Sequence, residues 1–189
     1  RQDHVANTMS SPYYRFDGLA SKITVADNPI LDDIFSNGGT ISAWIYPTSS
    51  GEGDLGEICQ KGESNAGFQL RFVSAKKLYF FQDWSTSNYY FTMDNATIDY
   101  DKWYHIVVTY NGSATANTAS FYINGTEETA ITHAGSRSGT INSDDGDAFL
   151  IGSLADGSRT WDGHISNIKL YNNVLTATEV KELYSGASV

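Results

Sequence analysis

The stretch Trp103-Tyr-His-Ile-Val-Val-Thr-Tyr110, followed after a polar loop by Ala119-Ser-Phe-Tyr-Ile-Asn-Gly-Thr126, decides the fold. Side chains alternate between the two faces of a β-strand, and the first segment has no fully polar face. Such a strand lies inside a sheet, with one face in a core and the other against a second layer or on a concave surface. Asn124-Gly125 supplies the two positive-φ residues of a tight turn. We expect this pair of strands at the centre of an antiparallel sheet.

Similar short apolar or alternating segments recur at spacings near ten residues along the chain, separated by turn-forming residues. We expect strands near residues 13–16, 22–25, 40–46, 57–61, 68–72, 77–81, 89–92, 148–152 and 161–171. The alternation in the last segment slips by one position, which predicts a β-bulge. Thr176-Ala-Thr-Glu179 has the pattern of a capping box and predicts one helix that stops at Gly186. We therefore predict an all-β fold, a two-sheet antiparallel jelly-roll sandwich with one short C-terminal helix.

The chain has 189 residues, of which 40% are hydrophobic and 13% aromatic, and this composition suits one β-sandwich domain. We expect that domain at residues 13–189, preceded by an N-terminal arm or linker at 1–12. The net charge of -10 argues against nucleic-acid binding, since such proteins gather Lys and Arg on one face. No apolar run approaches the roughly 18 to 20 residues needed to cross a bilayer, so membrane insertion is not expected.

Nine short motifs follow one another between Tyr13 and Gly186. They are Phe16-Asp-Gly18, Thr40-Ile-Ser-Ala-Trp-Ile-Tyr-Pro47, Lys61-Gly62, Trp103-Tyr-His-Ile-Val-Val-Thr-Tyr-Asn-Gly112, Phe121-Tyr-Ile-Asn-Gly125, Leu150-Ile-Gly152, Trp161-Asp-Gly163, Ile168-Lys-Leu-Tyr171 and Leu175-Thr-Ala-Thr-Glu179. In this order they resemble the laminin-G-like domains of the concanavalin-A-like lectin/glucanase superfamily. The resemblance implies a jelly roll whose concave face or loop rim often binds carbohydrate, sometimes with calcium. It does not fix the function, because the same fold carries lectin modules, glycan-cleaving enzymes and adhesion domains.

The enzyme hypothesis depends on paired carboxylates. Glucanases of the superfamily share a strand motif of Glu, any residue, Asp and then Glu, which sets the acid/base and the nucleophile on one face about 5 Å apart. This chain has Glu52-Gly-Asp54-Leu-Gly-Glu57, in which Gly53 and Gly56 replace strand-forming residues. We expect these carboxylates on a solvated loop. No other catalytic motif is present, and His105 is expected to be a buried strand histidine, so we predict no enzymatic activity.

Calcium is the cofactor to consider, because it takes six to eight oxygen ligands and accepts them from loops. By the resemblance, one site would combine Asp17, the carbonyl of Gly18 and Asn167 of the last strand, where relatives often have an acidic pair. The second candidate is the loop Asp144-Asp145-Gly-Asp147, in which three carboxylates surround a turn-forming glycine. A solvated turn before the next strand is the alternative interpretation of that loop.

Sugar binding requires an aromatic plane against the apolar face of a pyranose ring, with amides and carboxylates for its hydroxyl groups. The loop Gln82-Asp83-Trp84-Ser-Thr-Ser-Asn88-Tyr89-Tyr90 supplies that mixture. Trp84 lies among polar residues, and both an exposed sugar-contacting ring and a core position are open. Tyr89 and Tyr90 point to opposite faces, so at most one of them contributes. Arg159 and Trp161 supply a second set, although Trp161 also resembles a family position that often packs against the core.

These observations favour a non-catalytic carbohydrate-binding or cell-surface-recognition module of a secreted, cell-surface or virion protein. The expected partner is a glycan or a glycosylated surface, and other protein subunits are an additional candidate. The first alternative is a structural or adhesion domain that makes protein contacts, and the second is a glycan-cleaving enzyme. A glycan array with and without calcium would separate binding of glycans from a purely structural role.

Overall fold

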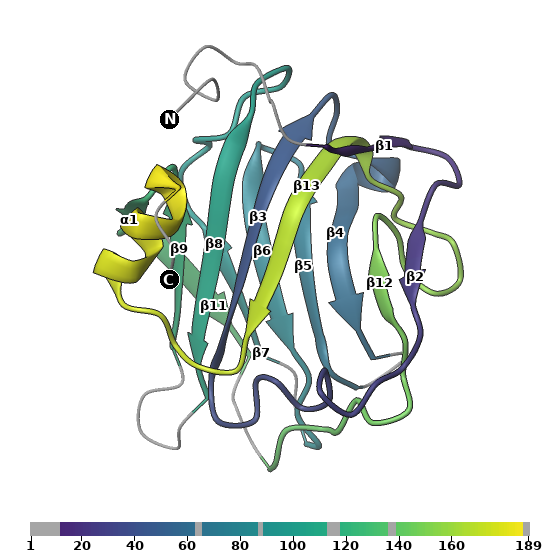
Figure 1. Cartoon of the computed structure of the whole chain (residues 1–189), viewed down its shortest axis with the longest axis vertical. Coiled ribbons are helices and arrows are strands. Elements are labelled where there is room, and N and C mark those ends of the chain that lie inside the picture. Colours follow the sequence, from purple (N-terminus) through teal and green to yellow (C-terminus); the bar gives the residue numbers. More distant parts are fainter. Residues whose placement is uncertain (1–11, 63–65, 87–88, 113–117, 136–138, 187–189) are drawn as a thin grey trace.

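The computed structural model describes residues 12–62, 66–86, 89–112, 118–135 and 139–186, which form two facing antiparallel sheets (Figure 1). The first sheet contains, in spatial order, β1 (Tyr14–Asp17), β13 (Asp162–Tyr171), β3 (Gly39–Pro47), β8 (Tyr104–Asn111), β9 (Thr118–Ile123) and β10 (Thr126–Glu128). The second contains β11 (Ile131–Ala134), β7 (Tyr89–Met93), β6 (Lys77–Gln82), β5 (Phe68–Val73), β4 (Leu55–Lys61), β12 (Phe149–Ile151) and β2 (Ile23–Val25). Within the described chain, the one α-helix is α1 (Ala177–Ser185), so the predicted jelly-roll sandwich is confirmed.

The predicted strand pair is the β8–β9 pair of the six-stranded sheet. Ile106 lies opposite Ile123, and Tyr110 lies opposite Ala119, in antiparallel register. The turn after β9 has the expected positive φ angles, 52° and 75° at Asn124-Gly125, and it leads into β10. The pair is interior to the sheet, but the centre of the sheet is β3–β8, because β10 adds only one strand beyond β9.

The core lies between the two sheets and is built from the inward-facing residues of the strands. Phe35, from the segment between β2 and β3, enters this layer. Its ring centroid lies 4.7 Å from that of Phe68 and 5.3 Å from that of Phe80. Fully burying one such side chain stabilises the fold by roughly 1.5–3 kcal/mol. Trp84 and Trp161 belong to the same core, with 6% and 0% of their surface exposed.

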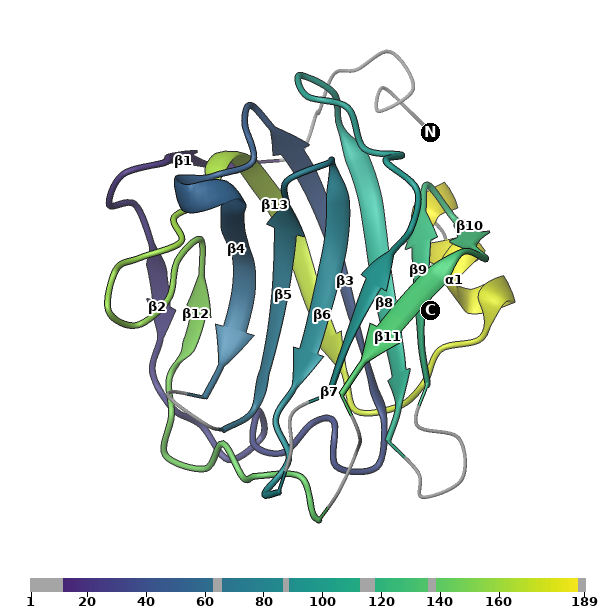
Figure 2. The ribbon, with the colours of Figure 1, turned by 180° about the vertical axis from the view of Figure 1, so that it is seen from behind.

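Helix α1 packs on the outer face of the six-stranded sheet. It begins with the predicted capping box, in which the Thr176 N–H donates to the Glu179 carboxylate over 2.7 Å and the Glu179 N–H donates back to the Thr176 hydroxyl. Val180 of the helix is buried against Val107 of β8 and Tyr122 of β9. The outer face of the seven-stranded sheet has no such cover, since no described helix lies in front of it in Figure 2.

Other local features agree with the sequence. β13 pairs with β3 on both sides of a register shift between Ser166 and Lys169, which is the predicted bulge. His105 is buried, and its Nε2 lies 2.9 Å from Ser42 Oγ. Of the predicted arm, residues 1–11 lie outside the described chain. In the described ranges, no helix has the length and apolar character that crossing a bilayer requires.

Candidate functional site

The strand register decides which side chains share the outer face of the seven-stranded sheet. Residues directly opposite each other on antiparallel neighbours point to the same side. Leu70 and Phe80 are such a pair and lie in the core, so the alternate positions of β5 and β6 face outward. One outward row contains Gln60, Gln69, Phe81 and Tyr90, and the next contains Glu57, Arg71, Tyr79 and Thr92. We call the set Gln60, Gln69, Arg71, Tyr79, Phe81 and Tyr90 the outer platform.

Tyr79 and Tyr90 form the aromatic part of the outer platform. Their rings stack with centroids 5.1 Å apart and planes 26° apart, and both side chains are partly exposed. The guanidinium carbon of Arg71 lies 5.3 Å from the Tyr79 ring centroid, in cation–π contact. Beside the rings, Gln69 Nε2 donates to Gln60 Oε1 over 3.3 Å. The facing sides of the two rings cover each other, so a ligand would meet the outer sides and edges of the pair, next to a guanidinium group and the Gln69 carboxamide. Sugar recognition uses such a combination of aromatic and polar groups.

Glu57 lies under the outer platform and is completely buried. Its Oε2 accepts a hydrogen bond of 2.9 Å from Arg71 Nε, whereas Oε1 has no hydrogen-bond partner among the described residues. Burial raises the pKa of Glu57 to about 8, against the opposing charges of Arg71 and Arg159. Burial therefore disfavours the charged form of Glu57, and the contact with Arg71 at ion-pair distance favours it.

Arg159 reaches the outer platform from the loop between β12 and β13. Its carbonyl accepts a hydrogen bond of 2.8 Å from the Glu57 N–H, which holds this loop beside β4. Its φ of 55° is a left-handed conformation that costs a residue other than glycine roughly 1–3 kcal/mol and often occurs at functional sites. Burial raises the pKa of both Glu57 and Tyr79, and the Arg159 charge opposes that rise in each case. The guanidinium group is therefore close enough to act on both side chains.

Two of the residues proposed from the sequence for sugar binding meet at this face. Tyr90 is part of the outer platform, and Arg159 lies beside it. Tyr89 points inward and packs edge-on against Phe91 at 4.8 Å, as expected for the neighbour of an outward residue. Asn88 lies outside the described residues. Sequence reasoning missed the outward positions of β5 and β6, although the alternation of Gln69, Arg71, Tyr79 and Phe81 with core residues carried the signal.

Three other proposed sugar-binding residues are buried. Trp84 belongs to the core, and after β6 it forms an isolated β-bridge with Ile141. The interpretation of Trp84 as an exposed sugar-contacting ring is therefore wrong. Trp161 is also a core residue, packed edge-on against Phe72 at 5.9 Å, so its core alternative is correct. Asp83 is 1% exposed, and its Oδ2 accepts a hydrogen bond of 2.6 Å from Asn142 Nδ2. None of these side chains is available on the surface for a glycan.

The first proposed calcium site is not assembled. Asp17 Oδ1 accepts three backbone hydrogen bonds of 3.0–3.1 Å from the turn that follows β1, led in effect by that from Ala20, and these hold its pKa well below the usual range. The Gly18 carbonyl accepts a hydrogen bond of 2.6 Å from the Thr160 hydroxyl. Asp17 pairs with Asp162, five strand positions from Asn167, which is about 16 Å at 3.3 Å per residue. These groups do not fit a common ion.

The second proposed calcium site, in the loop 144–147, is also divided. Asp144 is 3% exposed, and its Oδ1 accepts hydrogen bonds from Lys61 Nζ at 3.2 Å and from the Asp33 N–H at 2.9 Å. Asp145 is exposed, and the Asp147 N–H donates to the Asp144 carbonyl over 3.1 Å in a turn. The Asp144 carboxylate is therefore occupied by groups of the protein itself.

An acidic cluster does form around Lys61, and it combines different residues. Asp27, Asp32 and Asp145 offer carboxylate oxygens within 4.8 Å of one another. Lys61 Nζ lies 2.8 Å from Asp32 Oδ1 and 3.4 Å from Asp27 Oδ1, and the Lys61 side chain is fully buried. This ammonium group offsets part of the negative charge of the cluster from within the chain.

The segment Glu52-Gly-Asp54-Leu-Gly-Glu57 forms no catalytic pair of carboxylates. Glu52 and Asp54 lie in a 3₁₀ turn, Glu52–Asp54, in which Gly53 has a φ of 62°. The Thr160 N–H donates to Glu52 Oε2 over 3.4 Å, and the Ser50 hydroxyl donates to Asp54. Glu57 lies on β4, buried under Arg71. The three carboxylates therefore do not share one strand face, which the retaining mechanism requires.

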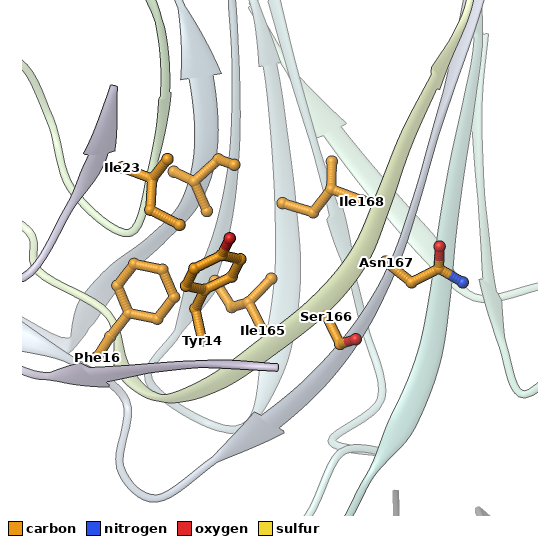
Figure 3. Close-up of a pocket in the computed structure, with 8 residues that line it drawn as sticks. Tyr14, Phe16, Ile23, Ile165, Ser166, Asn167 and Ile168 are labelled. Carbon is orange, nitrogen blue, oxygen red and sulfur yellow. The ribbon is translucent and has the colours of Figure 1, made fainter. Parts of the chain in front are cut away.

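An apolar pocket of about 220 Å³ opens at the edge of the sandwich, between β1 and β13 of one sheet and β2 and β12 of the other. Figure 3 shows the rings of Tyr14 and Phe16 beside Ile165, with Asn167 farther along the same lining. Asn167, proposed from the sequence as a metal ligand, lies here in the β13 bulge with a φ of 52°. The lining is mostly apolar, so it lacks the oxygen donors that calcium needs.

A laminin G-like family model, described as the concanavalin A-like lectin/glucanases superfamily, matches residues 17–181. The chain is a member of this superfamily. The membership confirms the resemblance carried by the nine motifs and agrees with the two-sheet architecture of this concanavalin A-like domain. No curated protein sequence matches the chain.

Solved structures share the fold of this concanavalin A-like domain. The CBM40 of the Ruminococcus gnavus IT-sialidase, bound to alpha2,3 sialyllactose, matches with a TM-score of 0.69 and 14% identity over 92% of this chain and 97% of that chain. Domain 4 of AbnA, an extracellular arabinanase from Geobacillus stearothermophilus in complex with arabinotriose, has a TM-score of 0.64 and 16% identity over 94% and 79%. The heptameric SAP-like pentraxin of Limulus polyphemus has a TM-score of 0.61 and 18% identity over 90% and 80%. At these identities the likeness establishes the fold alone.

Proposed function

We propose that this chain is a non-catalytic carbohydrate-binding module of a secreted, cell-surface or virion protein, and that it binds its glycan on the outer platform. The observation that carries the proposal is the stacked pair Tyr79–Tyr90 on a sheet face that no described helix covers. A pyranose ring presents an apolar face to such rings, while Gln69 and Arg71 can donate to its hydroxyl oxygens. The similar folds of carbohydrate-binding domains support this use of the sandwich.

The absence of catalysis follows from the carboxylates. Among the described residues of the two outward rows, Glu57 is the single acid, and it is buried and bonded to Arg71. Retaining hydrolysis needs two carboxyl groups about 5–5.5 Å apart, and inverting hydrolysis needs them at about 6.5–9.5 Å. A glycan on the outer platform would therefore meet no second acid in these rows, and it would be held without being cleaved.

We infer that binding on the outer platform is independent of calcium. Lys61 offsets part of the charge of the acidic cluster of Asp27, Asp32 and Asp145, and the cluster lies apart from the rows that form the outer platform. Addition of EDTA is therefore expected to leave glycan affinity unchanged. A loss of affinity in EDTA that calcium restores would contradict this part of the proposal.

The proposal is tested by glycan binding of the wild-type chain and of the Tyr79→Ala and Tyr90→Ala variants, measured by affinity electrophoresis on a polysaccharide panel and then by calorimetry. Each stacked ring contributes roughly 0.5–1.5 kcal/mol beyond its buried area, so each variant should lose about tenfold in affinity. The control is Tyr14→Ala, which removes a ring that is 67% exposed and lies on β1.

Three outcomes would overturn the proposal. Equal loss in the Tyr14 control would place the glycan elsewhere. Release of sugar products from a bound polysaccharide would favour the enzyme. Failure of the folded chain to bind any glycan of the panel would favour the adhesion domain that makes protein contacts.

A further inference from the structure

The outer platform has the opposite charge to the molecule as a whole. The chain has a net charge of -10. Lys77 lies two positions before Tyr79 on β6, so it shares the outward face with Tyr79 and Arg71. Arg159 approaches the same face from its loop. Within the two rows the charged residues are Arg71 and Glu57, so the positive excess comes from Lys77 and Arg159 beside them. A basic surface in an acidic protein attracts an anionic ligand to this face and repels it from the rest of the molecule.

Arg71 is positioned to hold an anion. Its Nε is bonded to Glu57 Oε2 at 2.9 Å, and its guanidinium group lies over the Tyr79 ring. Its terminal nitrogens donate no hydrogen bond to any described residue. A guanidinium group fixed in this way keeps two parallel N–H groups for a planar anion, and a carboxylate matches that fork.

Arg159 adds a second guanidinium group without a partner. In the described part of the chain, no carboxylate lies within ion-pair distance of it and no side chain accepts its hydrogen bonds. The Asp156 carboxylate accepts hydrogen bonds from the Ser158 hydroxyl at 2.7 Å and the Ser158 N–H at 2.9 Å. These bonds lower the pKa of Asp156, and the charge of Arg159 lowers it further.

We propose that the glycan bound by the outer platform is acidic, with a sugar ring packed against the Tyr79–Tyr90 pair and an exocyclic carboxylate paired with Arg71 and Arg159. The inference rests on the proposed function, because it names the ligand class of the same site. Uronic acids and sialic acids share this chemistry, a pyranose ring that carries a carboxylate. Buried Glu57 supports the arrangement, because its Oε2 accepts the hydrogen bond of Arg71 Nε and so orients the guanidinium group, whose terminal nitrogens are left for the ligand.

The experiment compares polymers that differ only in the carboxylate. Calorimetry or affinity electrophoresis measures binding of polygalacturonate, of the same polymer fully methyl-esterified, of sialyllactose beside its methyl ester, and of dextran sulfate as a sulfated polymer without carboxylates. The two acids distinguish the uronic and sialic sources, and each neutral partner keeps the ring while removing the charge. The variants are Arg71→Lys, which keeps the charge and loses the fork, and Arg159→Gln, with Arg15→Gln as an exposed cation on β1 for control.

We expect at least one carboxylated glycan to bind tenfold or more tightly than its neutral partner, and this preference to fall when NaCl is raised from 50 to 500 mM. Arg71→Lys and Arg159→Gln should each reduce the preference about tenfold, while Arg15→Gln should leave it unchanged. Because the Arg159 side chain makes no bond within the described chain, its loss should not disturb folding, which thermal unfolding checks.

The outcomes separate this inference from the function on which it rests. Equal binding of neutral and carboxylated partners, still dependent on Tyr79 and Tyr90, would overturn the acidic ligand and leave the carbohydrate-binding module standing. Tight binding of dextran sulfate without binding of either carboxylated glycan would also overturn it, in favour of a sulfated ligand. Failure to bind every glycan would overturn both.

Discussion

Removing the Lys61 ammonium group tests how far this buried cation stabilises the fold. It is fully buried and lies 2.8 Å from Asp32 Oδ1, 3.2 Å from Asp144 Oδ1 and 2.6 Å from the Asp144 carbonyl. Burial alone would lower the pKa of Lys61, but the hydrogen bonds and charges of these aspartates raise it above its ordinary value. Lys61→Met keeps most of the apolar stem and removes the charge.

The expected cost follows from the burial of the partners. The Asp144 side chain is 4% exposed, so without Lys61 it is a buried carboxylate with no cation. Removing one partner of a buried pair costs about 3–5 kcal/mol, which lowers the melting temperature of a domain of this size by roughly 6–20 °C. Asp144→Asn in the Lys61→Met background should recover part of this loss, because it removes the uncompensated charge.

Urea unfolding followed by fluorescence measures the change. The matched control is Lys102→Met, which breaks an ion pair of 3.0 Å with Asp99 whose side chains are 57% and 53% exposed, and it should cost less than about 1 kcal/mol. A loss below about 1 kcal/mol in Lys61→Met, or one equal to that of the control, would refute the view that this ammonium group compensates the acidic cluster.

The remaining predictions concern the buried tryptophans and Glu57. Trp84→Ala and Trp161→Ala should each destabilise the fold by about 3–5 kcal/mol in denaturant unfolding, and a loss below about 1 kcal/mol for either would place that ring outside the core. Burial raises the pKa of Glu57 from 4.5 to about 8, so its contribution to stability is complete below pH 4.5 and is lost as the pH rises towards 8. Glu57→Gln should therefore unfold at a progressively higher temperature relative to the wild type between pH 5 and pH 8, and parallel profiles would count against the raised pKa. Tyr79 and Cys59 also interact with Glu57, and burial raises the pKa of each, so both stay neutral across this window.

Local pattern in the sequence predicted most of the fold. The alternation around Trp103, the Asn124-Gly125 turn and the capping box at Thr176 each act over a few neighbouring residues, and each is present in the structure. The bulge in β13 was also predictable from the sequence, because a slip in the alternation moves side chains to the other face. The short strands β10 and β11 were missed, since their polar residues, such as Thr126-Glu-Glu128, carry no apolar pattern.

The candidate site was less accessible to sequence reasoning, because it depends on contacts between distant segments. Trp84 sits in a polar stretch, and only its bridge to Ile141, far along the chain, shows that its ring is covered. The acidic cluster likewise unites Asp27, Asp32 and Asp145 from two loops around Lys61. The outer platform was readable in part, because outward positions of neighbouring strands follow from alternation once the strand order is known.

The most direct test of the central claim is a crystal structure of the chain with the glycan that binds it most tightly. We expect a sugar ring packed against the Tyr79–Tyr90 pair, with Arg71 in hydrogen-bonding contact, on the outer face of the seven-stranded sheet. A glycan bound instead at the acidic cluster around Lys61, or in the apolar pocket beside Tyr14, with the outer platform empty, would contradict it.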